Sequence, residues 1–231
     1  MIPKIIHYVW LGKNPMSRLN LRCIESWQKY MPNYKIMLWN EKNSPMEHSY
    51  VQAAIKHNML AFAADYIRLW VLKKHGGIYM DTDMELIKNP ELILNDLEFF
   101  SGYESINTKF VNCAIFGANK DNKIISWMLD YIDKNCIPKK QFVIIPAIAS
   151  HIISQMPKNN SIKIFPHEYF YPYNPFDEQS DRQLMFSCIT QNTYAIHHWE
   201  YSWAKNFFWQ KIRTKLKKIL HIGWQINYGE M

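Results

Sequence analysis

The residues of this chain best suited to chemistry are two aspartates one residue apart, Asp81 and Asp83. They follow two adjacent glycines and a short apolar run in the segment HGGIYMDTDM, residues 75–84. On an extended strand, residues i and i+2 face the same side, so we expect the two carboxylates to lie together. Desolvated like charges repel each other unless a cation compensates them. Hard divalent ions such as Mg²⁺ or Mn²⁺ suit carboxylate oxygens and keep positions for substrate phosphates. The pair indicates a metal site for a nucleotide diphosphate, although Asp-x-Asp also occurs by chance on solvated loops.

A second polar pair precedes the aspartates in a strongly apolar helical stretch. Asp65 and Arg68 stand three residues apart, so they share one face of a helix. Residues 59–72 are otherwise almost wholly apolar, and burying charge there is costly. Two interpretations remain open: a buried ion pair that braces the helix, or polar groups that reach past the core to bind a ligand.

Alternating strands and helices place both pairs in an α/β domain. Strands over 4–10 and 34–40 flank a helix over 19–31, and such a β-α-β opening favours a parallel sheet. A helix over 51–75 ends at two lysines and Gly76, for which we expect a left-handed conformation. Gly77 then lets the chain turn sharply into a third strand over 78–84. Further strands are expected over 98–105, 112–118 and 193–203, a helix over 122–135, an apolar segment over 142–156 that starts another helix, and an extended segment over 161–175.

Composition restricts the class of protein. The 231 residues are 48% hydrophobic, which is typical of a globular chain with a real core and excludes a disordered one. No run of about 18 apolar residues exists, so we expect no membrane span, and the first apolar run is too short for a signal peptide. The four cysteines lack a C-x-x-C pattern and are interpreted as reduced, buried thiols of a cytosolic protein.

The basic charge is concentrated at the end of the chain, so we divide the sequence into a domain over 1–204 and a tail over 205–231. The tail carries six basic residues and one acid, a net +5 of the total +7. Its apolar positions 209, 212, 216, 219 and 220 recur at helical spacing between lysines. This predicts an amphipathic helix on an anionic membrane surface, hence a cytoplasmic protein, peripheral at the inner face of the cell membrane. A helix packed on the domain and a nucleic-acid contact are the alternatives. We expect no nucleic-acid partner, since such a protein would spread its charge over the domain.

Three segments together resemble a known enzyme family. The segment AADYIRLWVLKKHGGIYMDTDM, residues 63–84, is similar to the DXD region of glycosyltransferase family 32 and of the glucosylating domain of large clostridial toxins. IPKIIHYVWLG near the start and IHHWEYSW over 196–203 match as well, so the resemblance spans residues 1–204. It implies an α/β, GT-A type, Rossmann-like nucleotide-sugar-binding fold with a central mixed, mostly parallel sheet. It also implies a nucleotide-sugar donor, for which we expect a UDP-sugar, with Mn²⁺ or Mg²⁺ as cofactor.

The resemblance assigns roles to individual residues around the donor. Trp10 would stack on the nucleotide base, with core packing as the alternative. Asp65 and Arg68 would hold the hydroxyls of the transferred sugar. Tyr79 would lie near the ribose, although an inward-facing core tyrosine is nearly as plausible. Asn112 would line the sugar pocket.

The same resemblance implies a metal and phosphate site. Asp81 would contact the ribose or sugar and approach the metal, and Asp83 would bind it directly. Adjacent histidines on a strand face opposite sides, so one of His197 and His198 is the expected further ligand. His198 is preferred, because in the toxins the ligand stands five residues before a phosphate-contacting Trp, here Trp203. Ser202 and Trp203 would donate hydrogen bonds to the β-phosphate.

These assignments imply a metal-dependent, retaining transfer of a hexose or N-acetylhexosamine to a saccharide or lipid-linked oligosaccharide. The product would be capsule, lipopolysaccharide or another bacterial surface polysaccharide. Metal, Ser202 and Trp203 would neutralise charge growing on the leaving diphosphate, and its departing oxygen would act as base, so no essential protein nucleophile is expected. The chain departs from the family at IIPAIA, which keeps Pro146 but lacks a preceding glycine; this bears on acceptor or sugar-pocket detail. The alternatives are a toxin-like effector that glycosylates a protein, a metal-dependent phosphohydrolase and a non-catalytic membrane-binding module.

Overall fold

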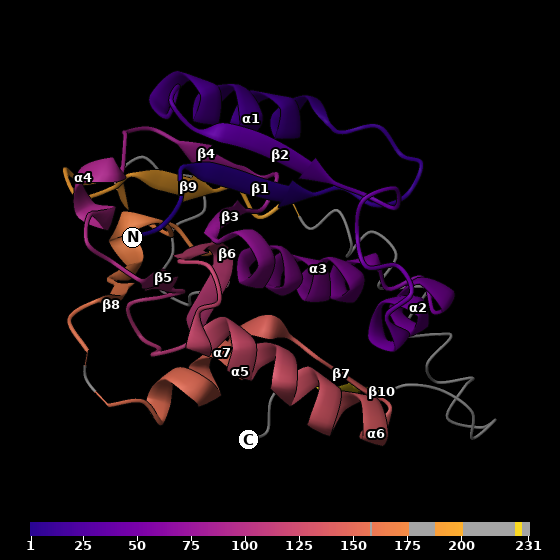
Figure 1. Ribbon diagram of the computed structural model, residues 1–231. Coiled ribbons are helices and arrows are strands. Elements are labelled where there is room, and N and C mark those ends of the chain that lie inside the picture. Colours follow the sequence, from indigo (N-terminus) through magenta and orange to yellow (C-terminus); the bar gives the residue numbers. More distant parts are fainter. Residues whose placement is uncertain (158, 176–187, 201–224, 228–231) are drawn as a thin grey trace.

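The chain opens with the β-α-β unit that the sequence predicts. The structure is a computed structural model that describes residues 1–157, 159–175, 188–200 and 225–227 (Figure 1). Strand β1 (Ile5–Val9) pairs in parallel with β2 (Lys35–Trp39), and α1 (Arg18–Tyr30) connects them. A capping box begins α1: the Ser17 hydroxyl accepts from the backbone of Asn20, and the Asn20 side chain accepts from the backbone of Ser17.

The long helical stretch that follows is divided in two. We expected one helix over 51–75, but α2 (Ser49–Lys56) and α3 (Leu60–His75) are separated by a turn. Asn58 is left-handed there, with φ 58°, a conformation that asparagine tolerates better than most residues. The expectation failed because helical spacing continues across the turn, while the chain uses it to pack α2 beside α3. Helix α3 is buried on most sides, as expected.

Two glycines end α3 and begin the next strand. Gly76 and Gly77 have φ values of 63° and 107°, which side-chain-bearing residues rarely adopt. A Cβ atom on Gly77 would also lie 2.6 Å from the carbonyl oxygen of Ile5 in the neighbouring strand. The glycine pair therefore allows β3 (Gly77–Met80) to turn directly out of α3 and to lie closely against β1.

A six-stranded sheet forms the centre of the domain, with the order β2-β1-β3-β6-β5-β8. The pairs β1–β2, β1–β3 and β5–β8 are parallel, whereas β6 runs antiparallel to β3 and β5. The α/β prediction with a central mixed, mostly parallel sheet is thus confirmed. Two short pairs lie outside this sheet: β4 with β9, antiparallel, and β7 with β10, parallel. The remaining elements are β4 (Met84–Leu86), α4 (Glu91–Leu94), β5 (Phe99–Tyr103), β6 (Val111–Ala118), α5 (Lys123–Tyr131), the π-helix η1 (Ile132–Cys136), α6 (Ile137–Lys139), β7 (Gln141–Val143), α7 (Ile145–Ser154), β8 (Ile162–Phe165), the 3-10 helix η2 (His167–Tyr169), β9 (Ala195–His197) and β10 (Gln225–Asn227).

The sheet separates two hydrophobic clusters, as the alternation of buried side chains in β3 shows. Tyr79 belongs to the cluster formed with α2, α3, α5 and α7, whereas Ile78 and Met80 belong to the cluster formed with α1. Figure 1 shows α3, α5 and α7 on one side of the sheet and α1 on the other. This three-layer arrangement holds the strand ends that carry the polar residues.

The tail prediction falls mainly on residues that the structure does not describe. The expected amphipathic helix would occupy residues within 201–224, which lie outside the described ranges, and the division at residue 204 stays a prediction. Of the tail, Gln225–Asn227 forms β10 and pairs with β7 of the domain. Among the described residues, no helix has the length and apolarity needed to span a membrane. All four cysteines are free, and three of them are buried: Cys23, Cys113 and Cys136.

Candidate active site

The polar residues gather where the sheet changes its direction of winding. From β1 the chain passes through α1 to β2 on one side, and later returns through α3 to β3 on the other side. The carboxyl ends of the parallel strands β1 and β3 therefore lie together at a topological switch point. In open α/β sheets, ligands bind in the crevice outside the strand ends at such a point.

The two aspartates lie on a turn at the carboxyl end of β3, and not on an extended strand. The strand ends at Met80, and the backbone N–H of Met84 donates to the carbonyl of Asp81 across the turn at 3.0 Å. Asp81 is anchored by its own N–H, which donates to Ala114 in β6 at 2.7 Å. The two carboxylates lie together as expected, but the turn brings them together and not the alternation of an extended strand.

His197 joins the aspartates, whereas His198 points elsewhere. Strand β9 pairs with β4 so that His197 lies opposite Met84, the residue after Asp83. Its Nε2 atom lies 3.4 Å from Asp83 Oδ2, while His198 Nε2 lies 2.8 Å from a carboxylate oxygen of Glu85. The preference for His198 is therefore not supported by the geometry. It rested on a spacing to Trp203, but the facing of the β9 side chains is set by pairing with β4.

Arg68 connects the apolar helix to the aspartate turn. Its Nη2 atom lies 3.0 Å from Asp65 Oδ1 and 3.2 Å from Asp81 Oδ1, and its Nη1 donates to the carbonyl of Cys113 at 2.8 Å. The guanidinium also lies over the ring of Tyr79, 4.5 Å from its centroid. The side chain links α3 to the turn, which agrees with the first interpretation, a buried ion pair that braces the helix. Ligand binding by Asp65 and Arg68 stays a prediction.

Tyr79 fits the core interpretation that the sequence left open. Its side chain is 1% exposed and belongs to the larger hydrophobic cluster. Its hydroxyl donates to Asp81 Oδ1 at 2.9 Å, on the oxygen that also faces Arg68. Tyr79 and Arg68 therefore fix the orientation of the Asp81 carboxylate from behind.

Burial and neighbouring charges shift the pKa values of these groups in different directions. Burial raises the pKa of Asp65 to about 6, although the Arg68 charge opposes the shift. Burial also raises the pKa of Asp81 above its usual range, again against Arg68. For Asp83 burial acts in the same sense, but the hydrogen bond and charge of His197 outweigh it and the pKa is lowered. Two neighbouring carboxylates in different environments are frequent at functional sites.

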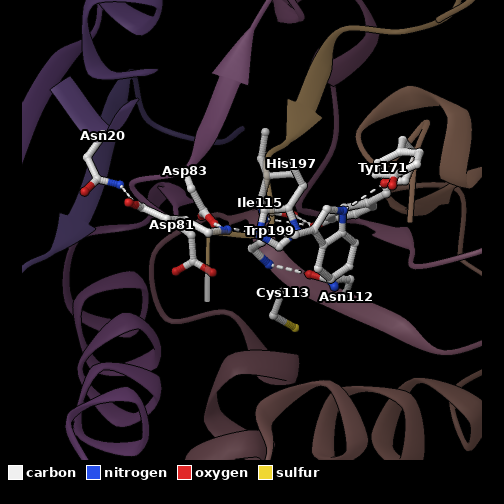
Figure 2. Close-up of polar contacts among 12 residues, drawn as sticks. Asn20, Asp81, Asp83, Asn112, Cys113, Ile115, Tyr171, His197 and Trp199 are labelled. Carbon is white, nitrogen blue, oxygen red and sulfur yellow. Dashed lines mark hydrogen bonds and ion pairs between the residues drawn. The ribbon is translucent and has the colours of Figure 1, made fainter. Parts of the chain in front are cut away.

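The turn and β9 together form a ligand set that fits a divalent cation. Ligand atoms of Asp81, Asp83 and His197 all lie within 4.8 Å of one another. The Nδ1 atom of His197 is buried and has no hydrogen-bond partner among the described residues. Two carboxylates and one imidazole suit Mn²⁺ or Mg²⁺ and leave further coordination positions open. Figure 2 shows the three side chains converging, with Asn20 on one side and Trp199 and Tyr171 on the other.

The remaining residues that the sequence assigned to the donor site lie at different places in the fold. Asn112 is the second residue of β6, at the same edge of the sheet; it is 6% exposed, donates to Glu104 at 3.0 Å and accepts from Ala114 N–H. Trp10 follows β1 and is half-buried outside both hydrophobic clusters, with its Nε1 donating to the carbonyl of Asn14. Ser202 and Trp203 lie outside the described residues.

Three contributors to the site were not foreseen from the sequence. The backbone N–H of Glu200 donates to Asp83 Oδ2 at 2.9 Å, and Asn20 donates to the Glu200 carboxylate at 2.8 Å. The Trp199 ring lies 4.0 Å from that of His197, centroid to centroid. The capping-box spacing at 17–20 identifies Asn20 as a helix residue, but nothing local connects it to a residue 180 positions away.

Comparison with known proteins gives a consistent result. Residues 17–100 match the family described as the glycosyltransferase sugar-binding region containing DXD motif. The uncharacterized glycosyltransferase L373 of Acanthamoeba polyphaga mimivirus is 27% identical over a stretch that covers 96% of this chain and 92% of that protein.

Solved structures show a similar fold. PaToxG glycosyltransferase superposes with a TM-score of 0.54 and 20% identity, covering 67% of this chain and 69% of that one. A glycosyltransferase involved in the glycosylation of the major capsid of PBCV-1 gives a TM-score of 0.50 and 11% identity, covering 91% and 100% of the two chains. These two superpositions show the fold that the resemblance in the sequence implies. The chain therefore has a GT-A type α/β fold and is similar to DXD-containing glycosyltransferases over residues 17–100, and to a viral glycosyltransferase over 96% of its length.

Proposed function

We propose that this protein is a metal-dependent glycosyltransferase that transfers a hexose or N-acetylhexosamine from a nucleotide sugar, most simply a UDP-sugar, to a saccharide acceptor with retention of configuration. One observation supports this most strongly. Asp81, Asp83 and His197 offer ligand atoms within 4.8 Å of one another at the sheet's switch point, directly beside the Asp65–Arg68 pair. In this arrangement a bound cation would lie beside groups able to hydrogen-bond the hydroxyls of the transferred sugar.

In this proposal some residues bind the cation and others orient the residues that bind it. Asp83 is the proposed primary metal ligand, with Asp81 and a neutral His197 beside it. Arg68 and Tyr79 hold Asp81 in place, and Arg68 is close enough to the turn to approach the diphosphate. When bound, the divalent cation would supply electrostatic stabilisation of the leaving diphosphate. Ser202 and Trp203 would add hydrogen bonds to the β-phosphate.

Donor and acceptor recognition follows from neighbouring groups. Trp10, half-buried after β1, offers a ring on which a nucleotide base can stack. Asp65, Arg68 and Asn112 would contact the transferred sugar. A departing phosphate oxygen that faces the acceptor can serve as base, so no essential protein nucleophile is required.

The acceptor is proposed to be a saccharide or lipid-linked oligosaccharide of a capsule, lipopolysaccharide or other surface polysaccharide. The basic 205–220 stretch supports this, since an amphipathic cationic segment would bring the enzyme to an anionic membrane where lipid-linked acceptors reside. The proposed location is therefore the cytoplasmic face of the cell membrane, without a nucleic-acid partner.

A protein acceptor is the alternative. The PBCV-1 enzyme of similar fold is involved in the glycosylation of a capsid, so the fold also serves enzymes whose sugar reaches a protein. A toxin-like effector would place its sugar on a protein directly. Acceptor trials with a lipid-linked oligosaccharide and with a protein extract distinguish these two possibilities.

The test is hydrolysis of a panel of UDP-sugars and GDP-mannose, with and without Mn²⁺, by the native chain and by Asp83→Ala. We expect Mn²⁺-dependent hydrolysis of one donor and its loss in the variant, because Asp83 is the carboxylate that His197 and Glu200 hold in place. Asp130→Ala is the matched control, since it removes only an exposed ion pair with Lys134 and should retain full activity.

Hydrolysis that needs no metal, or that survives Asp83→Ala, would contradict the metal-dependent mechanism. Absence of both turnover and Mn²⁺-dependent nucleotide binding for every donor would contradict the donor class and favour a non-catalytic membrane-binding module.

A further inference from the structure

The residue after Trp199 contacts the aspartate turn through its backbone. Glu200 N–H donates to Asp83 Oδ2 at 2.9 Å, and His198 N–H donates to the carbonyl of Asp83 at 3.0 Å. Between these two contacts Trp199 adopts a left-handed conformation with φ 52°, which costs free energy in a non-glycine residue. Residues 198–200 thus curve around Asp83, and other contacts have to stabilise this strained backbone.

Asn20 provides such a contact through a hydrogen bond to Glu200. It is 2% exposed, and its Nδ2 donates to Glu200 Oε2 at 2.8 Å. Its Oδ1 is already used by the capping box, where it accepts from Ser17 N–H at 3.0 Å. Because the oxygen is committed to the cap, the amide orientation is fixed and the –NH₂ group faces Glu200.

The cap alone does not require an amide at this position. A capping box needs only an acceptor on the third helical residue, and Glu or Gln usually provides it. The donor half of the Asn20 side chain is used by Glu200. Asparagine therefore combines a helix cap with a long-range hydrogen bond, and an acid of the same shape could make only the first.

Helix α1 also holds the other side of the turn. Trp27 Nε1 donates to the carbonyl of Met84, and Leu86 N–H donates to the hydroxyl of Ser26, so α1 is bonded to β4 directly after Asp83. With Asn20 bonded to Glu200, the same helix contacts both chain segments that flank the Asp83 carboxylate.

We propose that Asn20 and Glu200 are positioning residues for the metal site: the Asn20 amide holds the Glu200 carboxylate, and this hold keeps the Glu200 N–H on Asp83 and orients Asp83 toward the cation. The proposal rests on the proposed function, since it assumes that Asp83 binds a metal. It extends the site to α1, which supplies none of the three clustered ligand atoms.

The test uses a charge-balanced set of variants and Mn²⁺ alone as probe, with free Mn²⁺ measured by electron paramagnetic resonance. Asn20→Asp keeps the shape and the cap acceptor but puts a carboxylate against Glu200. Glu200→Gln keeps an acceptor for the native Asn20 amide. In the double variant Asn20→Asp/Glu200→Gln the hydrogen bond is restored with donor and acceptor exchanged, and the net charge equals that of the native chain.

We expect Asn20→Asp to bind Mn²⁺ about tenfold more weakly than the native chain, a change of about 1.4 kcal/mol. Glu200→Gln should stay within about twofold, and the double variant should recover most of the loss. The direction is informative, because an added negative charge near the site would by itself strengthen cation binding. Weaker binding therefore has to come from displaced geometry.

Three outcomes would overturn the proposal in distinguishable ways. If the native chain shows no Mn²⁺ binding that Asp83→Ala removes, the proposed metal site fails, and this inference fails with it. If that binding exists but Asn20→Asp leaves it unchanged, only the positioning role fails. If Asn20→Asp and the double variant are equally weak, the loss reflects damage to α1, and thermal unfolding in EDTA would show it as a shared drop in Tm.

Discussion

At the scale of single residues, Arg68 joins several charged and polar groups of the site. One guanidinium, 8% exposed, faces two carboxylates and a backbone carbonyl and stacks on a tyrosine ring. Its pKa is raised, since the attraction of Asp81, Tyr79 and Asp65 exceeds the opposing effect of burial. A planar fork of donors makes these contacts from one position, which an ammonium group cannot do.

Arg68→Lys should therefore be a severe change despite the retained charge. We expect the free energy of unfolding to fall by about 2 kcal/mol, because at least one buried carboxylate loses its hydrogen bond. Donor hydrolysis should fall by about tenfold or more as Asp81 loses its support. The measurements are urea denaturation and initial rates. The matched control is Arg22→Lys in the exposed pair with Glu25, which should change stability by less than about 0.5 kcal/mol. Equal effects of the two substitutions would contradict the network.

At the scale of elements, the connection from α3 to β3 depends on backbone space. Gly77 combines a φ of 107° with an approach to Ile5 that leaves no room for a side chain. The parallel pairing of β1 and β3, which creates the switch point, begins one residue later at Ile78. The element that presents the aspartates is therefore positioned by a residue that has no side chain.

Gly77→Ala should cost about 4 kcal/mol of unfolding free energy, since it combines backbone strain with a clash against a carbonyl oxygen in a neighbouring strand. Gly102→Ala is the control: its Cβ would meet the ring edges of Phe170 and Tyr171 at 3.0 Å and 3.1 Å, and side chains adjust more easily than backbone. We expect about 1 kcal/mol there. Comparable losses for both variants in chemical denaturation would argue against the backbone explanation.

The elements were predictable from the sequence wherever the signal was local. The β-α-β opening, the glycine-ended helix and the strand before Asp81 follow from hydrophobic spacing and from glycine chemistry. The break at Asn58 was missed because apolar spacing at helical period continues across it. The turn at Asp81–Asp83 was missed because the strand was expected to continue past Met80 to residue 84.

The part of the site made by distant segments could not be read from local patterns. Which of two adjacent histidines faces the aspartates depends on the register of β9 against β4. The bond from Asn20 to Glu200 depends on the docking of α1. Long-range register and docking are settled by the packed fold, and a single sequence carries no direct signal for them.

At the scale of the whole molecule, His7 of β1 links β2 and the end of α3 through hydrogen bonds. It is fully buried in β1; its Nε2 donates to the carbonyl of Gly76, and its Nδ1 accepts from Trp39 Nε1 at 3.0 Å. Both ring nitrogens are thus satisfied only in the neutral form. Burial lowers the pKa of His7 to about 4, despite the opposing hydrogen bond to Gly76.

The stability of the whole protein should therefore fall as the pH falls from about 6.5 to 4. In that window the unfolded chain binds a proton at His7 and the folded chain does not, so unfolding becomes more favourable with added protons. The contribution is about 3 kcal/mol, fully present above pH 6.5. His7→Gln, whose amide can donate to Gly76 and accept from Trp39, should be less stable at pH 7 but flatter in its pH dependence. Tm measured from pH 4 to 7.5 would show this, and parallel curves for the two proteins would contradict it.

The hydrogen bond from α1 to Glu200 joins residues 180 positions apart, and the bond from Glu200 N–H to Asp83 spans 117 positions. During synthesis on the ribosome, the aspartate turn exists in the chain long before the imidazole and the backbone amide that complete it. A nascent or partly unfolded chain offers only two neighbouring carboxylates, a weak ligand set with no orienting partner. The entropic cost of closing these large loops has to be met before the imidazole and the amide reach the turn. Strong cation capture would thus be a property of the finished fold alone, and a nascent chain would compete little for the cell's free divalent metal.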